Sequence, residues 1–326
     1  MRYTLVLFIL FSINVTSAAD PLPSWNAGPA KDAIINYVKC ATNDGCPLYV
    51  LPKERIAVFD NDGTLWSEQP AYFQLLFALD RVKALADQHP EWKTEQPFKA
   101  VLENDYQTIA ASGKAGLLKI MAVTHSGMTT DEFADTVRNW IKTARHPEKK
   151  VPYTKLVYQP MLEVMNFLRA NGFKTYIVSG GGVDFLRVWA EDVYGIPPEQ
   201  VIGSSIKVKF EERDGKPVIV RLAEIDFIDD KEGKPVGIHR FIGRAPVIAF
   251  GNSDGDLPML QWTDRRENTL QVIVHHTDAQ REYAYDRNSH IGRLDKALDE
   301  GQEKGWTVID MQRDWKRIYP APASDD

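Results

Sequence analysis

The chain has 326 residues, 44% of them hydrophobic, a length and composition that suit one sizeable folded core with a smaller unit beside it. Its formal net charge is −6, and no stretch is rich in Lys and Arg. This composition offers no basic surface for DNA or RNA, so we expect no nucleic-acid partner.

The N-terminus has the pattern of a secretory signal peptide. Met1-Arg2 supplies a positive start, residues 5–15 are mostly apolar, and residues 16–19 are small enough to suit cleavage before Asp20. The apolar run is shorter than the roughly 20 residues that cross a bilayer. No Cys lies at the cleavage point, so we expect residues 1–19 to be removed and the protein to be exported, periplasmic or secreted, without a membrane anchor.

The sequence holds two cysteines, Cys40 and Cys46, and in an exported protein they favour one disulfide that closes a small turn. Two free thiols or a pair of metal ligands are the alternatives. The disulfide would lie in an N-terminal extension, residues 20–50, whose helix over residues 31–38 packs against the core. We expect this extension to be structural and to take no part in chemistry.

Residues 55–66 combine a buried strand with an acidic turn. Residues 56–59 form a short apolar run with β-branched members, which suits an inner strand of a parallel sheet. Asp60 and Asp62 follow at its carboxyl end, where ligands bind in open α/β sheets. One carboxylate can attack as a nucleophile while the other transfers protons, and a divalent cation such as Mg²⁺ would neutralise both. The alternative is a polar Asx turn that only caps the strand.

A long stretch with helical character follows. Apolar residues recur at helical spacing from Leu75 to Ala86, and residues 129–132 form a capping box that opens a further helix. We therefore expect a helical cap over residues 69–152, inserted between the two parts of an α/β core, residues 51–68 and 153–318. The Met and aromatic residues of this insertion are expected to form its own core.

Helix and strand then alternate, which predicts an α/β fold whose parallel sheet of at least five strands carries helices on both faces. Asp214-Gly215 between two alternating segments predicts a β-hairpin. The tail, residues 319–326, is rich in Pro, Ala and Asp and is expected to be flexible. The later strands are expected over residues 173–178, 206–222 (the hairpin), 247–250, 270–274 and 307–309, with helices over residues 161–170 and 183–193.

Two of these strands also end in polar, Gly-rich turns. Ser179 offers a hydroxyl group, and Gly180 with the glycines after it lets main-chain N–H groups approach an anion closely. Residues 252–256 offer oxygen atoms to a cation. A fixed positive charge is still needed to hold the nucleophile and phosphoryl oxygens together. Lys234 is the candidate, because the Pro that follows it suits the first position of a helix, and Lys231 is the rival.

Together these turns resemble the four motifs of the haloacid dehalogenase (HAD) superfamily. The matching residues, in order, are Asp60-Asn61-Asp62-Gly63-Thr64, Ser179, Lys234 and the acidic turn of residues 251–256. The resemblance covers about residues 55–260 and implies a Rossmann-like parallel sheet. The helical insertion resembles a cap of the first type in this superfamily. The hairpin before Lys234 and residues 251–260 look most like its phosphoserine-phosphatase-like branch.

The resemblance implies a mechanism of phosphate-ester hydrolysis. Asp60 would attack phosphorus and form an aspartyl-phosphate, while Asp62 would protonate the leaving alcohol and then activate water. Ser179, the amide of Gly180 and Lys234 would hold the phosphoryl oxygens. Mg²⁺ would neutralise charge and align the ester with the attacking carboxylate. The implied Mg²⁺ ligands are a carboxylate oxygen of Asp60, the carbonyl oxygen of Asp62 and the last turn, with Asn252 and Asp256.

The chain departs from the phosphoserine phosphatases in the metal and substrate positions. Asn252 stands where Asp is usual, so the metal should bind more weakly unless Asp256, or alternatively Asp254, compensates. Glu68 is one position early for the substrate-binding Glu of these enzymes, and the cap shows no convincing Arg. Phosphoserine is therefore not favoured, and the expected substrate is another small organic phosphomonoester.

Asp62 favours phosphomonoester hydrolysis, because a dehalogenase of this superfamily needs no proton donor there and its transport ATPases carry Thr. Two other functions are the alternatives. A catalytically degenerate HAD-fold binding protein is favoured by Asn252 alone, and a HAD phosphotransferase would use the same scaffold. The substrate pocket is expected where the cap meets the core, next to one or more of Trp66, Tyr72 and Phe73.

The histidines are expected to be structural. His275 and His276 are adjacent in a strand and so face opposite ways, which does not suit a metal pair. His125 and His239 are isolated in the sequence and are expected at the surface or as polar residues of the core.

Overall fold

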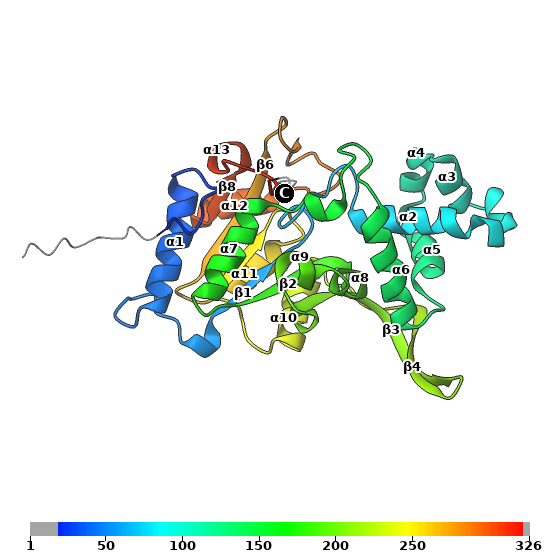
Figure 1. Ribbon diagram of the computed structural model, residues 1–326. Helices are drawn as coiled ribbons and strands as arrows, with labels where there is room; N and C mark the ends of the chain where they lie inside the picture. The colour runs from blue at the N-terminus through cyan, green and yellow to red at the C-terminus, as the bar shows by residue number, and fades with distance from the viewer. Residues whose placement is uncertain (1–18, 322–326) are drawn as a thin grey trace, which may run out of the picture.

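The structure, a computed structural model, describes residues 19–321. Residues 1–18 of the predicted signal peptide and residues 322–326 of the predicted tail lie outside this range. At the centre is an eight-stranded, mainly parallel sheet of order β4-β3-β2-β1-β5-β6-β7, with β8 also paired to β6 (Figure 1). The predicted α/β fold is confirmed. The strands are β1 (Ile56–Phe59), β2 (Lys174–Gly182), β3 (Val201–Arg213), β4 (Lys216–Phe227), β5 (Ile248–Gly251), β6 (Leu270–Thr277), β7 (Ala284–Tyr285) and β8 (Thr307–Asp310).

Strand β1 lies in the middle of the sheet, paired in parallel with β2 on one side and β5 on the other. All four of its residues are buried, because alternate side chains face two helical layers. Ala57 and Phe59 belong to the larger hydrophobic cluster, and Ile56 and Val58 to the cluster on the other face. The continuous apolar run in the sequence thus reflects burial on both faces.

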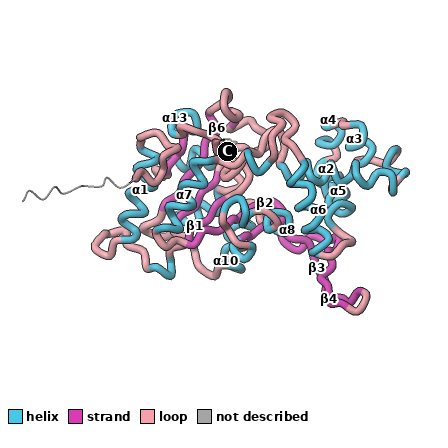
Figure 2. Tube along the Cα trace, viewed as in Figure 1, coloured by secondary structure: helices cyan, strands magenta, loops and turns pink. Residues whose placement is uncertain are grey.

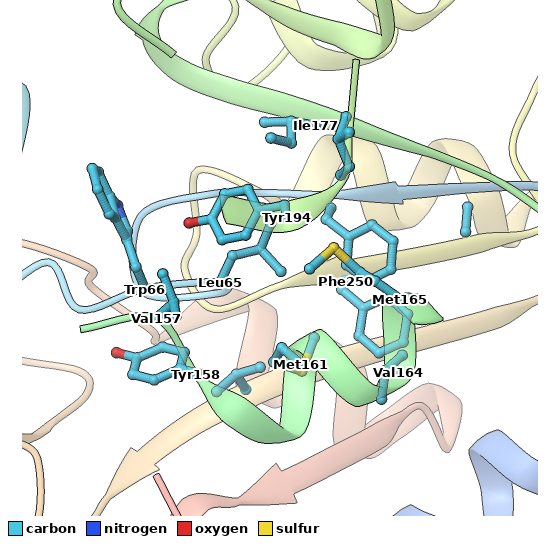
Figure 3. Packing of buried hydrophobic residues seen from close by; sticks show 14 of the residues in the cluster. Leu65, Trp66, Val157, Tyr158, Met161, Val164, Met165, Ile177, Tyr194 and Phe250 are labelled. Carbon is cyan, nitrogen blue, oxygen red and sulfur yellow. The ribbon is translucent and has the colours of Figure 1, made fainter. Parts of the chain in front are cut away.

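Helices cover both faces of the sheet. The first layer includes α1 (Pro29–Thr42), α7 (Gln159–Ala170) and α9 (Ala190–Tyr194), and the second includes α10 (Gly233–Phe241), α11 (Leu257–Asp264) and α12 (Lys296–Lys304). Met161, Val164 and Met165 of α7 pack in the same cluster as Phe250 of β5 (Figure 3). In the extension, Cys40 and Cys46 form the predicted disulfide. No helix of residues 19–321 is long and apolar enough to cross a membrane.

The segment between β1 and α7 is largely helical, and its helices gather at one end of the sheet (Figures 1 and 2). Its helices are α2 (Phe73–Leu85), α3 (Phe98–Glu103), α4 (Tyr106–Ala111), α5 (Gly113–His125) and α6 (Thr130–Thr143). Helices α2 to α5 share a hydrophobic cluster that includes Val82, Trp92 and Phe98, whereas Phe133 and Val137 of α6 belong to the larger cluster of the core. Thr129 and Glu132 form the predicted capping box at the start of α6.

The β3–β4 hairpin is longer than predicted and joins the helical insertion to the core. The main chain of Arg221 in β4 pairs with the loop between α5 and α6, accepting from Gly127 N at 2.9 Å and donating to Met128 O at 3.0 Å. The buried Arg221 guanidinium donates to His125 O at 2.7 Å and forms an ion pair with Asp184 of α8 (Val183–Arg187). One side chain therefore links the hairpin, the insertion and the core.

Three local predictions were wrong, each for a tertiary reason. The single helix expected over residues 183–193 is broken into α8 and α9, and Trp189 at the break stacks on Trp66 at 4.3 Å between ring centroids. Helix α10 begins at Gly233, so Pro235 is its third residue; the first turn tolerates Pro because its N–H groups lack intrahelical partners. Tyr319 belongs to the folded part, since its hydroxyl lies 2.8 Å from Ser67 Oγ.

We expect Arg221→Met to lower the free energy of unfolding by about 2 kcal/mol, because it leaves the partly buried Asp184 carboxylate without its cation. Urea denaturation measures the change. Arg213→Met, on the same hairpin, is the control: it removes an exposed pair with Glu211 and should change little. Equal effects of the two substitutions would contradict the linking role of Arg221.

Candidate active site

The polar turns after β1, β2 and β5 meet at one edge of the sheet, because these three strands are parallel neighbours. A cavity of about 410 Å³ opens there, between the sheet and the helical insertion. Its polar lining includes Asp60, Asp62, Glu68, Gly180, Gly181, Lys234, Ser253 and Asp256. Most of the residues singled out in the sequence are thus brought to one place.

Lys234 is the buried cation of this site. Its Nζ donates to Asp60 Oδ1 at 2.5 Å, to Asp256 Oδ1 at 2.6 Å and to the carbonyl oxygen of Val178 at 2.8 Å. Burial would lower the pKa of Lys234, but the Asp256 and Asp60 carboxylates outweigh it and raise the pKa, so the amine stays charged. Lys231 is exposed and makes none of these contacts. The structure therefore places Lys234, rather than its rival, at the nucleophile candidate.

Asp60 and Asp62 lie in different surroundings although they are two residues apart. Burial and the Asp256 carboxylate raise the pKa of Asp60 well above its usual range, against the opposing effect of Lys234. Asp62 makes no salt bridge within residues 19–321; its Oδ1 accepts from Trp66 Nε1 at 2.8 Å, and burial raises its pKa. One carboxylate is held by a cation while the other can keep a proton, a division that suits a nucleophile and an acid.

Asp256 organises the last turn instead of pointing a free oxygen into the cavity. Its Oδ1 accepts from Lys234, and its Oδ2 accepts from the main-chain N–H groups of Asn252 and Ser253 at 2.9 and 3.0 Å. Asp254 faces elsewhere: its Oδ1 accepts from the N–H groups of Asp295 and Ala297, at the start of α12. Asp254 is therefore a helix-capping residue of the fold.

Asn252 pairs with Glu68 in the interior of the site. The amide Nδ2 of Asn252 donates to Glu68 Oε1 at 2.7 Å, and its Oδ1 accepts from Thr64 Oγ1 at 3.1 Å. The hydroxyl of Tyr285 donates to the same Glu68 oxygen at 2.8 Å. Glu68 is buried, so an acidic side chain lies directly beside the position where Asn replaces the usual Asp.

Gly63 allows this pair to form. Its φ of 75° lies in the left-handed region, and an added Cβ would fall 2.1 Å from Asn252 Nδ2 and 2.4 Å from Glu68 Oε1. The carbonyl oxygen of Gly63 accepts from His276 Nε2 at 2.7 Å, and the other ring nitrogen of His276 lies 3.2 Å from Glu282. His276 is thus structural, as predicted, and it fixes the loop that carries the two catalytic candidates.

The glycine-rich end of β2 forms another part of the cavity wall. Ser179 is buried, and its Oγ accepts from the N–H of Gly181 at 3.0 Å, while Gly180 and Gly181 line the cavity. The N–H of Gly182 donates to Gln74 Oε1 at 2.6 Å, and Gln74 Nε2 donates to His125 Nε2 at 3.2 Å. Gln74 and His125 belong to the helical insertion, so this chain of hydrogen bonds holds the insertion against the glycine turn.

Of the three aromatic candidates for the pocket, Tyr72 lines the cavity. Trp66 and Phe73 are buried and pack on each other with ring centroids 4.6 Å apart. Sequence reasoning missed Gln74, Tyr285 and the supporting role of His276. No local motif marks them, because each reaches the site from a segment distant in the chain.

The residues present fit a hard divalent cation such as Mg²⁺. Five carboxylates line the cavity, those of Asp60, Asp62, Glu68, Asp230 and Asp256, and among the lining residues Lys234 is the cation. The carbonyl oxygen of Asp62 has no hydrogen-bond donor among the residues described. Within residues 19–321, no three His, Cys, Asp or Glu side chains form a ready-made metal cage. Mg²⁺ needs none, since it binds one or two carboxylates and completes its shell with water and substrate oxygens.

A family model for haloacid dehalogenase-like hydrolases matches residues 57–261, more than half of the chain. The chain therefore belongs to this family of hydrolases, and the predicted superfamily membership is confirmed. A search of curated proteins finds no match.

Solved structures with a similar fold include proteins of several bacteria. A conserved protein of unknown function from Anaerococcus prevotii DSM 20548 is 18% identical, with a TM-score of 0.52 over 89% of this chain and 94% of that chain. A protein of unknown function from Bordetella pertussis Tohama I is 18% identical, with a TM-score of 0.47 over 79% of this chain and 99% of that one. A phosphoserine phosphohydrolase-like protein from Francisella tularensis subsp. tularensis SCHU S4 is 17% identical, with a TM-score of 0.42 over 80% and 95%. At 18% identity and a TM-score of 0.52, the similarity to the Anaerococcus prevotii protein shows a shared fold.

A buried carboxyl group also lies under the helix that carries Lys234. Both oxygens of Asp229 are buried without a hydrogen-bond partner, and an added Cβ on Gly237 of α10 would fall 2.3 Å from Asp229 Oδ1. Burial raises the pKa of Asp229 to about 7, from an ordinary value of 3.8. The carboxyl is therefore favoured in its neutral form in the folded protein.

We expect Asp229 to make folding stability fall as the pH rises from about 4 to about 7, since the folded state then holds the proton that the unfolded state has lost. Asp229→Asn should remove this contribution, so its stability relative to the wild type should rise by up to about 4 kcal/mol between acidic and mildly alkaline pH. Urea denaturation at several pH values measures the difference. A constant difference would show that Asp229 is ionised in the folded protein.

Proposed function

We propose that the protein is a Mg²⁺-dependent phosphomonoester phosphatase of the phosphoserine-phosphatase-like branch that acts through an aspartyl-phosphate on Asp60. The observation that carries the proposal is the pairing of Asp60 with the buried Lys234 at 2.5 Å, with Asp62 beside it in the same cavity. An amine that neutralises one side of a buried carboxylate leaves the other oxygen to attack an anionic ester.

The reaction would proceed in two displacements at phosphorus. The carboxylate oxygen of Asp60 that does not bind Lys234 attacks phosphorus, the ester P–O bond breaks, and Asp62 gives its proton to the leaving alcohol oxygen. Asp62 then takes a proton from water, whose oxygen attacks the phosphorus of the aspartyl-phosphate and releases inorganic phosphate and Asp60. Mg²⁺, when bound, would neutralise the charge of the carboxylates and the ester.

The phosphoryl oxygens would be held by hydrogen bonds from the glycine turn, and the positive charge of Lys234 would attract them electrostatically. The Ser179 hydroxyl now accepts from Gly181 N and is free to donate its own hydrogen to an anion. The Gly180 amide lies in the same turn, at the cavity wall. Gly180 and Lys234 line the same cavity as Asp60, so they can stabilise the non-reacting phosphoryl oxygens while Asp60 attacks phosphorus.

For the metal, we propose that Glu68 supplies the negative charge that Asn252 lacks. The two side chains are hydrogen-bonded at 2.7 Å, so Glu68 occupies the neighbourhood of the usual Asp. Asp60, the Asp62 carbonyl and the Asn252 amide oxygen would be the direct ligands. Asp256, which sequence reasoning placed among the ligands, would instead position Lys234 and the turn, because its two oxygens are already occupied.

We expect Glu68→Gln to weaken Mg²⁺ binding by about 10-fold, as measured by isothermal titration calorimetry, because it removes a negative charge beside the ion. Adding Asn252→Asp should restore the affinity. The control is Glu163→Gln, a buried glutamate of α7 that does not line this cavity, which should bind Mg²⁺ as the wild type does. Unchanged Mg²⁺ affinity in Glu68→Gln would contradict the proposal that Glu68 supplies the charge that Asn252 lacks.

We expect the mature chain, beginning at Asp20, to hydrolyse an aryl phosphate with Mg²⁺ and to lose this activity with a chelator. Asp60→Asn should lower kcat by on the order of 1,000-fold or more while keeping the fold, since the two side chains are nearly isosteric. Phosphate release measures the rate, and circular dichroism checks the fold. Retained activity in Asp60→Asn would refute the nucleophile, and a folded, Mg²⁺-bound wild type inactive on every monoester would favour the binding-protein alternative.

The chain is also proposed to have two domains and to be exported. We propose that residues 69–152 form the cap and that residues 51–68 and 153–318 form the catalytic core. Export is supported by the signal-like N-terminus and by the Cys40–Cys46 disulfide, which persists in oxidising compartments.

A further inference from the structure

Large apolar side chains remain exposed next to the reaction centre. These side chains are 39–45% exposed, although large apolar residues are usually buried: Tyr72, Leu117, Leu118, Ile225 and Ile228. Three of them, Tyr72, Leu117 and Ile228, line the cavity that holds Asp60 and Asp62. They come from segments far apart in the sequence, so the fold gathers them at this place.

A second cavity, of about 200 Å³, continues from the first. The two share lining residues from the glycine turn and from α5, including Gly180, Gly181, Leu117 and Met121. We use the name apolar chamber for the region lined by Leu117, Leu118, Met121, Ile225, Phe227 and Ile228. It begins where a phosphoryl group bound at Gly180 would end.

The charged and polar groups around the chamber are already paired. Arg221 forms its ion pair with Asp184, and Gln74 is held between Gly182 and His125. Burial lowers the pKa of His125 to about 3, so this ring is neutral. At the opening, Asp230 is an exposed carboxylate. No lining cation of the described chain is therefore free to bind a carboxylate on a leaving group.

We propose that the apolar chamber receives the alcohol part of the substrate, and that the substrate is a phosphomonoester of an apolar alcohol with an alkyl or aromatic body. This inference rests on the proposed phosphatase function. Continuity with the catalytic cavity selects this occupant over a protein partner, because a group attached to phosphorus at Gly180 has the chamber directly in front of it. Phosphorylated amino acids and sugars would leave their polar groups without partners there.

The test compares phosphate esters of primary alcohols, whose leaving groups differ little in intrinsic reactivity. We expect kcat/KM for 2-phenylethyl phosphate to exceed that for glycerol phosphate and phosphoserine by roughly 10- to 100-fold. The difference should lie mainly in KM, because binding transfers the phenyl ring from water into the apolar chamber. Phosphoethanolamine tests the Asp230 carboxylate. The inference would be overturned if phosphoethanolamine, glycerol phosphate or phosphoserine were the best substrate.

Two substitutions locate the preference in the chamber. Leu117→Asn should lower kcat/KM for 2-phenylethyl phosphate about 10-fold and leave glycerol phosphate nearly unchanged. The control, Leu51→Asn, replaces a leucine that is 48% exposed, against 43% for Leu117, and that lies outside both cavities. Equal effects of the two substitutions, or an equal loss on both esters, would contradict the inference.

Binding separates this inference from the phosphatase proposal. 2-Phenylethylphosphonate has no ester bond to break, so calorimetry can compare its affinity with that of ethylphosphonate whether or not the protein turns over. Tighter binding of the phenylethyl compound in an inactive protein would support the chamber and refute the phosphatase. Turnover by a protein that binds the two phosphonates equally well would support the phosphatase and refute the chamber. Dimerisation that Leu117→Asn abolishes, with no change in selectivity, would show that a second copy covers the chamber.

Discussion

The site depends on the burial of the Lys234 amine between two carboxylates. A buried charge is tolerated only when its partners satisfy it, and here Asp60, Asp256 and the carbonyl oxygen of Val178 do so. Because these partners follow β1, precede α11 and lie in β2, a single side chain aligns three neighbouring segments of the sheet edge. The same contact lowers the negative charge at Asp60 and orients it, so the interaction that organises the site is also the one that prepares its chemistry.

Around that centre the structure compensates for one unusual residue. Asn252 lacks the negative charge of the Asp that is usual at this position in the superfamily, and the buried Glu68 carboxyl group lies within hydrogen-bond distance of it. The arrangement needs Gly63 in a left-handed conformation and the hydroxyl of Tyr285 from β7. Under our proposal the missing charge comes from Glu68, a residue of another segment of the chain.

The sequence predicted the parts of the fold that local patterns control. The apolar run before Asp60, the capping box at Thr129 and the hairpin around Asp214-Gly215 each specify their own structure, and the motif turns meet because parallel strands end at one edge. What it missed depends on contacts between distant segments. Gln74 reaches Gly182 across 108 residues, and the break before Trp189 serves its stacking on Trp66, so neither leaves a local pattern.

The central claim is that Asp60 carries the phosphoryl group during turnover. The direct measurement is to quench the wild-type protein with acid during hydrolysis of a phosphomonoester, reduce it with borohydride and sequence the peptides by mass spectrometry. Borohydride reduces an aspartyl-phosphate to homoserine, so we expect homoserine at position 60 only when substrate and Mg²⁺ are both present. Active protein with unmodified Asp60, or with the modification at Asp62 instead, would contradict the account.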